Sequence, residues 1–249
     1  MVERRASSPV ATFYSPDALE AGQTAILGEE VAHHMRVRRI EPGEVVRLTD
    51  GVGHRTLGTL RRLTKGRADV EVGEAVEEIE SPPAIHLLVP VADRDRMLWL
   101  AEKVTEIGIA SWRPVSWRRS KSVSPRGEGA GFHAKARARM IGALEQSGGA
   151  WLPSLYPDAP IDRALSALPE GARFLLDAPG GGFLAAMGGP PAVRAPLVIA
   201  VGPEGGMEAD EVARFTAEGF RPVTLGGTIL RFETAAIAAL AIARAVLES

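Results

Sequence analysis

Two glycine-rich turns near the C-terminus carry the residues best suited to chemistry. The first is Gly202 to Gly206, with Glu204 at its centre, and the second runs from Leu225 to Ala235 with Arg231. Glycine lets a ligand approach the main chain closely. The carboxylate of Glu204 repels phosphate, and neither turn matches a phosphate-binding or dinucleotide-binding glycine motif. The turns favour a neutral or cationic small molecule, although each turn alone is also compatible with a plain strand-turn-helix.

Buried strands are needed to bring both turns to one edge of a sheet. Residues 195–201 and 223–225 are apolar runs that stop at glycine, which is typical of parallel strands buried on both faces. The acidic residues Glu208, Asp210 and Glu211 suit the positive end of a helix between them. Such a crossover places both turns at the carboxyl ends of strands, where open α/β sheets bind ligands.

The same alternation continues through the second half of the chain, which we expect to be an α/β domain with a parallel sheet. Strands are predicted at 85–91, 112–117 and 173–177, and helices at 96–107, 134–146, 161–168 and 234–247. The last helix is apolar on nearly every face, so we expect it to be buried. Residues 178–182 are predicted to be a third loop of the pocket or a flexible connector.

The first part of the chain predicts a separate small β-barrel. Short alternating segments at 45–49, 54–60 and 68–72 are separated by Asp-Gly and Lys-Gly turns, after a helix at 28–39. The acidic, proline-containing segment 74–83 is predicted to be a linker. We therefore expect a barrel domain over 1–75 and an α/β domain over 83–249.

A net charge of −2 hides two basic blocks. Residues 31–67 hold nine Arg or Lys against three acids, and residues 113–139 hold eight against Glu128. Arginine dominates both blocks, and its planar fork suits phosphates and bases. A solvated basic face is the alternative. The candidate RNA-binding residues are Arg36, Arg38, Arg39, Arg118, Arg119 and Lys121.

The two turns together resemble the C-terminal signature of the RsmE family, G-P-E-G-G followed by L-G-x-x-I-L-R-x-E-T-A. Members of this family, in the SPOUT superfamily, methylate N3 of a uridine in bacterial 16S ribosomal RNA. Residues 33–39 and Asp50-Gly51 resemble the family's N-terminal PUA-like domain, more loosely. Thr228 and Gly149 stand where many relatives carry arginine. The resemblance implies S-adenosylmethionine as cofactor, a trefoil knot, and a homodimer that acts on 16S ribosomal RNA or the assembled small subunit.

The resemblance also implies roles for particular residues. Arg231 would be catalytic, because a guanidinium beside the uracil carbonyls favours the anionic base; an ion pair with Glu233 or Glu204 is the alternative. Glu204 is the second catalytic candidate; it would contact the ribose or the cationic end of the cofactor, or brace its loop. No histidine lies in either turn, so the group that takes the N3 proton is left open. The residues expected to bind the cofactor are Leu176, Gly202, Pro203, Gly205, Leu225, Gly226, Ile229, Leu230 and Ala235.

Composition excludes several other classes of protein. The chain has no cysteine, which rules out disulfides and thiolate metal sites. The adjacent His33 and His34 would point about 100° apart on a helix, so we expect no metal site. No apolar stretch reaches the ~18 residues of a membrane span, and we expect a cytoplasmic protein. The alternatives are a SPOUT methyltransferase with another RNA target and a non-catalytic RNA-binding factor for ribosome assembly.

Overall fold

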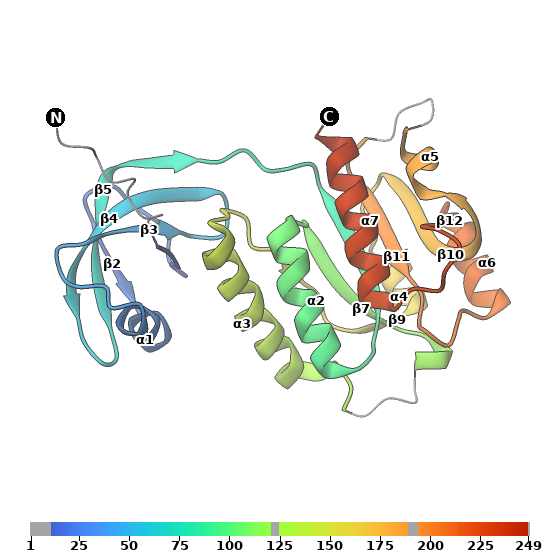
Figure 1. Cartoon of the computed structure of the whole chain (residues 1–249), viewed down its shortest axis with the longest axis horizontal. Coiled ribbons are helices and arrows are strands. Elements are labelled where there is room, and N and C mark those ends of the chain that lie inside the picture. The colour runs from blue at the N-terminus through green and yellow to red at the C-terminus, as the bar shows by residue number, and fades with distance from the viewer. Residues whose placement is uncertain (1–10, 121–124, 189–193, 249) are drawn as a thin grey trace. The chain divides into compact units, whose positions relative to one another are not determined.

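The computed structural model describes residues 11–120, 125–188 and 194–248, which fall into two compact units (Figure 1). The first unit contains the chain up to Ser81 together with Ile141–Leu152. The second contains Pro82–Met140 and the chain from Pro153 onward.

The first unit contains a five-stranded sheet and helix α1 (Glu29–Val37). Its strand order is β1-β3-β4-β5-β2, in which β1 and β3 are parallel and the other neighbours are antiparallel. The strands are β1 (Thr12–Tyr14), β2 (Thr24–Leu27), β3 (Val45–Thr49), β4 (His54–Leu63) and β5 (Ala68–Glu78). Alternate residues of β3 to β5 turn inward onto a core that includes Phe13 and Met35. The strands predicted at 45–49, 54–60 and 68–72 are confirmed.

The linker predicted at 74–83 is wrong for its first half. Strand β5 continues to Glu78 because residues 76–78 pair with residues 54–56 of β4. These backbone hydrogen bonds join segments about twenty residues apart, so the local acidic composition did not reveal them.

The C-terminal end of helix α3 (Gly129–Ser147) and the residues after it belong to the first unit. Glu145 accepts a hydrogen bond from the backbone N–H of Tyr14 at 2.9 Å. The indole Nε1 of Trp151 donates to the carbonyl of Ile79 at 3.1 Å. Residues 141–152 thus complete the first unit, although they follow the end of its last strand, β5, by about sixty residues.

The second unit is built on a parallel sheet of seven strands. The order is β12-β10-β11-β6-β7-β8, and β9 also pairs with β7. The strands are β6 (Ile85–Pro90), β7 (Ser111–Ser116), β8 (Ser154–Leu155), β9 (Ala159–Pro160), β10 (Ala172–Gly182), β11 (Leu197–Val201) and β12 (Arg221–Thr224). Every residue of β11 is buried, as expected for a parallel strand covered on both faces.

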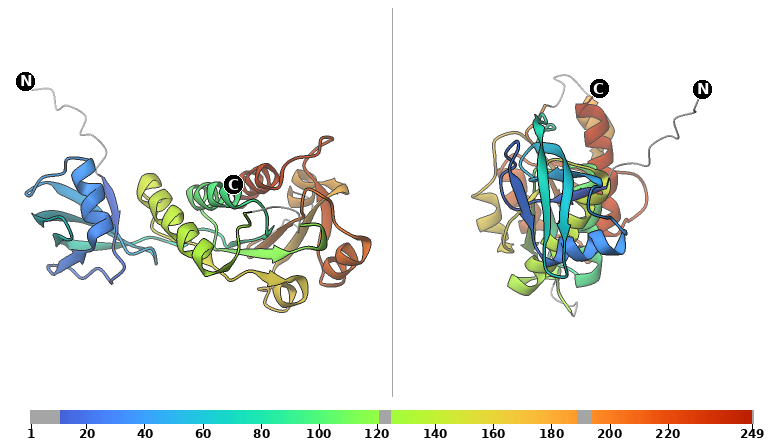
Figure 2. Two further views of the ribbon diagram at one scale, coloured as in Figure 1. Left: turned by 90° about the horizontal axis from the view of Figure 1, so that it is seen from below. Right: turned by 90° about the vertical axis from the view of Figure 1, so that its left-hand side faces the viewer.

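Helices cover both faces of this sheet (Figure 2). The helices of the second unit are α2 (Arg94–Ile107), most of α3, α4 (Ile161–Leu165), α5 (Phe183–Gly188), α6 (Ala209–Ala217) and α7 (Phe232–Leu247), with a 3-10 turn at Arg118–Ser120. On one face, α4 and α6 share a core in which Trp117 stacks on Phe215 with ring centroids 4.9 Å apart. Helix α7 packs against α2, α5, β6 and β11.

Strand β10 differs from its prediction, because residues 178–182 are strand rather than loop or connector. Its pairing with β12 shifts register between Leu176 and Gly181. A Cβ on Gly180 would lie 2.4 Å from the backbone nitrogen of Val223, so only glycine allows the two backbones this close. Within the glycine run, Gly180 is therefore required by the packing of β10 on β12.

Helix α7 is buried on one side only, which corrects the prediction that it is buried all round. Ala236, Ala239, Leu240 and Ala243 are buried, whereas Ala241 is exposed. The described part of the chain contains no helix that is both long and apolar enough to cross a bilayer.

Candidate functional site

A cavity of about 330 Å³ opens at the carboxyl ends of β10, β11 and β12. Strand β10 lies between the other two, so the turns after β11 and β12 flank it. The start of α7 closes the remaining wall. The residues predicted from sequence that line the cavity are Leu176, Gly202, Pro203, Glu204, Leu225, Gly226, Ile229, Leu230 and Ala235.

Two predicted site residues lie outside this lining. The carbonyl of Gly205 accepts a hydrogen bond from Nη1 of Arg119 at 3.1 Å, and a Cβ at Gly205 would lie 3.2 Å from Cβ of Arg119. Arg231 is exposed and precedes α7 as its N-cap. The hydrogen bond from Arg96 is the main reason that the pKa of Glu204, in the pocket wall, lies below its ordinary value, and the positive charge of Arg231 adds to this lowering.

The cavity wall is mainly apolar, with two carboxylates. Val201, Met207 and Phe232 contribute apolar side chains, and Asp177 adds a carboxylate at the end of the buried part of β10. Sequence reasoning missed Asp177 as a site residue, although its place directly after a predicted strand was an available signal. It also missed Met207, which directly follows the G-P-E-G-G motif, and Phe232, which occupies an unspecified position within the second motif.

Gly202 shapes the first turn by leaving room for Met207. A Cβ at Gly202 would lie 2.7 Å from Cγ of Met207, so the methionine side chain can fold back against the turn only because glycine is there. Gly206 has a φ of 76°, in the left-handed region that favours glycine. Gly202 and Gly206 are therefore needed for the backbone of this wall.

Arg96, in the first turn of α2, contacts both turns. It pairs with Glu204 in the first turn and with Glu233 at the start of α7. Both carboxylates considered above as partners of Arg231 are thus taken by Arg96. No sequence signal pointed to it, because Arg96 is more than a hundred residues from either carboxylate.

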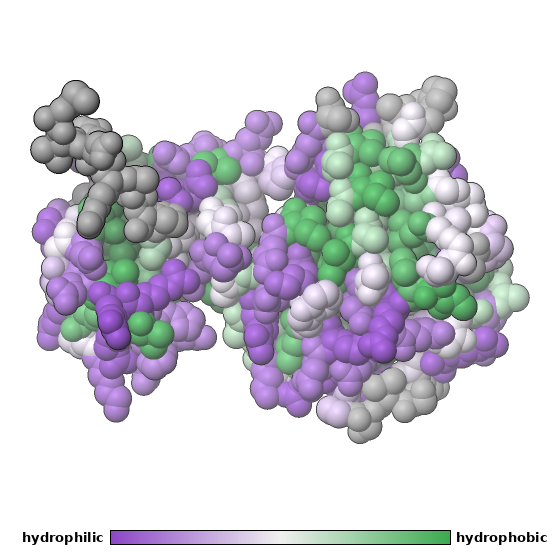
Figure 3. Space-filling view, in the orientation of Figure 1, coloured by the Kyte–Doolittle hydropathy of each residue, from purple (hydrophilic) through white to green (hydrophobic). Residues whose placement is uncertain are grey.

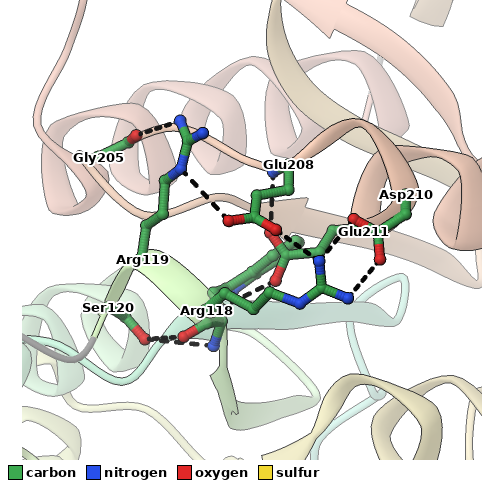
Figure 4. A network of polar contacts seen from close by, with 8 residues as sticks. Arg118, Arg119, Ser120, Gly205, Glu208, Asp210 and Glu211 are labelled. Atoms are coloured by element: carbon green, nitrogen blue, oxygen red, sulfur yellow. Dashed lines mark hydrogen bonds and ion pairs between the residues drawn. The ribbon is translucent and has the colours of Figure 1, made fainter.

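A second arginine network holds the first turn from outside (Figure 4). Arg118 pairs with Glu208 and Asp210 at the start of α6, and its backbone N–H donates to Glu211 at 3.0 Å. The hydrogen bond from Arg118 is the main reason that the pKa of Asp210 lies below its ordinary value. Arg119 lies 3.7 Å from Glu208 and also contacts Gly205.

These contacts bear on the predicted RNA-binding residues of the second basic block. Arg118 and Arg119 are half exposed, and their guanidinium groups hold the 202–206 turn and the first turn of α6. Lys121 lies outside the described residues.

The candidate RNA-binding arginines of the first unit gather at the C-terminal end of α1. Arg36 donates from Nε to the carbonyl of Ala32 at 3.2 Å, and Arg38 lies over the ring of Phe13 at 5.9 Å. Arg39 follows the helix with a φ of 57°. All three are exposed. The described residues contain no cluster of histidine and acidic side chains that could hold a metal ion.

Comparison with known proteins defines the class first. Residues 79–244 match the family model of the RNA methyltransferase domain, and residues 27–73 match that of the RNA methyltransferase PUA domain. The parallel sheet with its pocket and the N-terminal sheet are thus the two parts of an RNA methyltransferase of the α/β class with a PUA-like domain.

The relatives narrow this class. A ribosomal RNA small subunit methyltransferase E from Mycobacterium bovis is 30% identical, over 92% of this chain and 88% of the relative. One from Synechocystis is 26% identical, over 100% of this chain and 82% of the relative. The chain belongs to the family of ribosomal RNA small subunit methyltransferase E.

Solved structures agree with this assignment. The crystal structure of ribosomal RNA small subunit methyltransferase E from Neisseria gonorrhoeae, bound to S-adenosyl methionine, has a TM-score of 0.85 and 31% identity. It covers 96% of this chain and 98% of its own. A putative methyltransferase from Legionella pneumophila, in complex with the cofactor SAM, also has a TM-score of 0.85, at 28% identity and with the same coverage.

Proposed function

We propose that this protein methylates N3 of a uridine in 16S ribosomal RNA, with S-adenosylmethionine as the methyl donor. The observation that carries the proposal is the pocket built from the two glycine turns in a chain of this family. Its walls are apolar, its charged groups are the carboxylates Asp177 and Glu204, and it holds no phosphate-binding motif. A pocket of this kind suits a cationic nucleoside better than a nucleotide.

The residues present fit S-adenosylmethionine. Leu176, Leu230 and Phe232 offer apolar surface to an adenine, and the backbone of the second turn offers polar groups to its edge. The carboxylate of Asp177 suits ribose hydroxyls, as acidic residues at strand ends do in other nucleoside sites. Glu204 brings negative charge to the cationic end. When bound, the donor supplies a methyl group on a positively charged sulfur, and the protein supplies proximity and orientation.

Arg231 is the residue we assign to the uridine. Uridine N3 carries a proton at neutral pH, and its loss leaves an anionic base. Arg231 is exposed directly before α7, and its charge is felt at Glu204 in the pocket wall. A guanidinium there would stabilise the anionic uracil electrostatically.

Arg36, Arg38 and Arg39 are proposed to contact the RNA backbone from the first unit, because all three are exposed at one end of α1. In the second unit, Arg118 and Arg119 would act mainly by holding the 202–206 turn and the start of α6. The exposed parts of their guanidinium groups would be available to RNA phosphates. The partner would be 16S ribosomal RNA or the assembled small subunit, which places the protein in the cytoplasm.

We also propose a homodimer. Apolar side chains gather over α7 and α5 on one face of the second unit (Figure 3). Leu184 in α5 is 62% exposed and Ile229, in the pocket lining, is 93% exposed. Contiguous apolar surface of this kind marks interaction sites. A second copy would cover the pocket as well as α7. The trefoil knot is part of the same proposal and rests on the family resemblance.

The test combines binding, activity and one substitution. The wild type should bind S-adenosylmethionine in a calorimetric titration. After small subunits are incubated with the protein and S-adenosylmethionine, mass spectrometry should detect a methylated uridine in their 16S RNA. Arg231→Ala should lose methylation by roughly a hundredfold or more while donor affinity stays within several-fold.

Arg214→Ala, which removes an exposed arginine from α6, is the control and should retain activity. Loss of donor binding in Arg231→Ala would make that residue structural. A wild type that binds RNA but gives no heat with the donor would instead be a non-catalytic assembly factor, and methylation at another position would make it a different RNA methyltransferase.

A further inference from the structure

Arg96 lies where three segments of the second unit meet. Its Nε donates to Oε1 of Glu233 at 2.9 Å, and its Nη2 donates to Oε2 of Glu233 and to Oε1 of Glu204. Its guanidinium carbon lies 4.8 Å from the ring centre of Phe232, which lines the pocket. One side chain of α2 therefore touches the first glycine turn and the beginning of α7, behind the pocket wall.

The two carboxylates differ in burial. The side chain of Glu233 is 10% exposed, that of Arg96 is 26% exposed, and that of Glu204 is 47% exposed. A buried carboxylate without its cation is costly, so the contact with Glu233 anchors the arginine. The contact with Glu204 faces solvent and is weaker by itself. Without the guanidinium, the two acids would repel each other across the pocket wall.

The backbone of α2 fixes Arg96 in place. The side chain of Asp93 caps the helix by accepting hydrogen bonds from the N–H groups of Asp95 and Arg96 at 3.1 and 3.0 Å. Met97 and Leu100 are buried and anchor the same turns. The guanidinium is thus presented from a rigid element rather than from a mobile loop.

We propose that Arg96 is a positioning residue for the methyl donor: it holds Glu204 at the pocket wall and ties the 202–207 turn to the start of α7. The inference rests on the proposed function, because the ligand is the donor assigned there. A planar fork can serve both carboxylates at once, whereas an ammonium on a flexible stem cannot reproduce that geometry. Lysine at this position should therefore preserve only part of the effect.

Donor binding is the first test. Arg96→Met should weaken S-adenosylmethionine binding in calorimetry about tenfold, and raise KM for the donor with kcat within about threefold. Arg96→Lys should fall between this variant and the wild type, and remains usable if Arg96→Met does not fold. The control is Lys103→Met on the same helix, which removes a cation that pairs with Glu102 and Glu106, and should bind within twofold of the wild type.

Hydrogen exchange gives a second readout that needs no ligand. In Arg96→Met, backbone amides of residues 202–207 and 225–233 should exchange about tenfold faster, whereas Lys103→Met should leave them unchanged. Adding Glu204→Gln to Arg96→Met should restore part of the protection, because the repulsion between the two acids is removed.

The outcomes separate the two hypotheses. If the wild type fails to bind the donor, the proposed function fails, and exchange alone then decides whether Arg96 holds the turns. If the wild type binds the donor, and the Arg96 variants bind within twofold of it with unchanged exchange, the role of Arg96 is overturned while the proposed function stands.

Discussion

Glu145 is a carboxylate that the first unit has removed from water. Its side chain is 6% exposed, accepts the N–H of Tyr14, and lies 3.5 Å from Nδ1 of His34. Burial raises its pKa above the ordinary value of 4.5, although the Tyr14 hydrogen bond, His34 and Arg38 partly oppose the shift. A residue in the last turns of α3 thus links the stability of the first unit to protonation.

The sign of this linkage gives a test. Because the folded pKa of Glu145 is raised, the folded state keeps the proton longer than the unfolded state, so its contribution to stability is full below pH 4.5 and is lost as pH rises through the raised pKa. Glu145→Gln keeps the acceptor for Tyr14 and should remove this loss.

Denaturant unfolding at several pH values from 4 to 8 should therefore show a flatter pH dependence for Glu145→Gln than for the wild type. Glu74→Gln, at an exposed glutamate of the same unit, is the control. An identical pH profile for Glu145→Gln and the wild type would contradict the effect of burial.

At the scale of elements, the close approach of β10 and β12 at Gly180 leads to a prediction about the stability of the fold. Gly180→Ala would press a methyl group against the backbone of Val223, and backbone cannot swing aside as a side chain can. We expect a loss of about 1–3 kcal/mol in the free energy of unfolding, as for other overpacked sites. Gly181→Ala, one residue along the same strand, meets nothing within 4 Å and should stay within about 0.5 kcal/mol of the wild type. Equal stabilities of the two variants would argue against the close approach of β10 and β12.

Most elements were predictable because their patterns are local. Residues 197–201 are apolar throughout and form a buried strand. Helix α2 has an apolar stripe that is visible in the sequence, and it is capped by Asp93 at its start and Gly108 at its end. The end of β10 was not predictable, since a Pro-Gly-Gly-Gly sequence forms a strand here only because β12 pairs with it. Pairing of that kind depends on tertiary structure and leaves no local signal in the sequence.

The pocket shows the same division. Its lining by the two turns followed from glycines at strand ends, which are visible in sequence. The contact of Arg96 with Glu204 and Glu233 was not visible, because α2 carries several charged residues and nothing local selects the one that faces the pocket. The partners of Arg118 were missed for the same reason. A basic cluster in a sequence indicates RNA binding, and nothing local shows that Arg118 pairs with Glu208 and Asp210 at the start of α6.

At the scale of the whole molecule, the half-exposed apolar side of α7 predicts self-association. Ala241→Glu places a charge at an exposed position of α7, where it should leave the single chain folded but oppose a second copy. We expect sedimentation equilibrium to show a dimer for the wild type and a shift of at least about tenfold toward monomer for the variant.

Ala213→Glu, at an exposed alanine of α6, is the matched control and should remain dimeric. A monomeric wild type would refute the proposed dimer, and a dimeric Ala241→Glu would place its interface elsewhere.

The division of α3 between the two units has a practical consequence for anyone who wishes to study the RNA-binding part alone. A protein shortened to the first 81 residues would lack Glu145 and Trp151, and with them the acceptor of Tyr14 and the donor to Ile79. No single cut in the chain releases the first unit intact. A covalent graft of residues 141–152 onto the shortened chain, through a flexible tether, is the smallest version that retains these contacts.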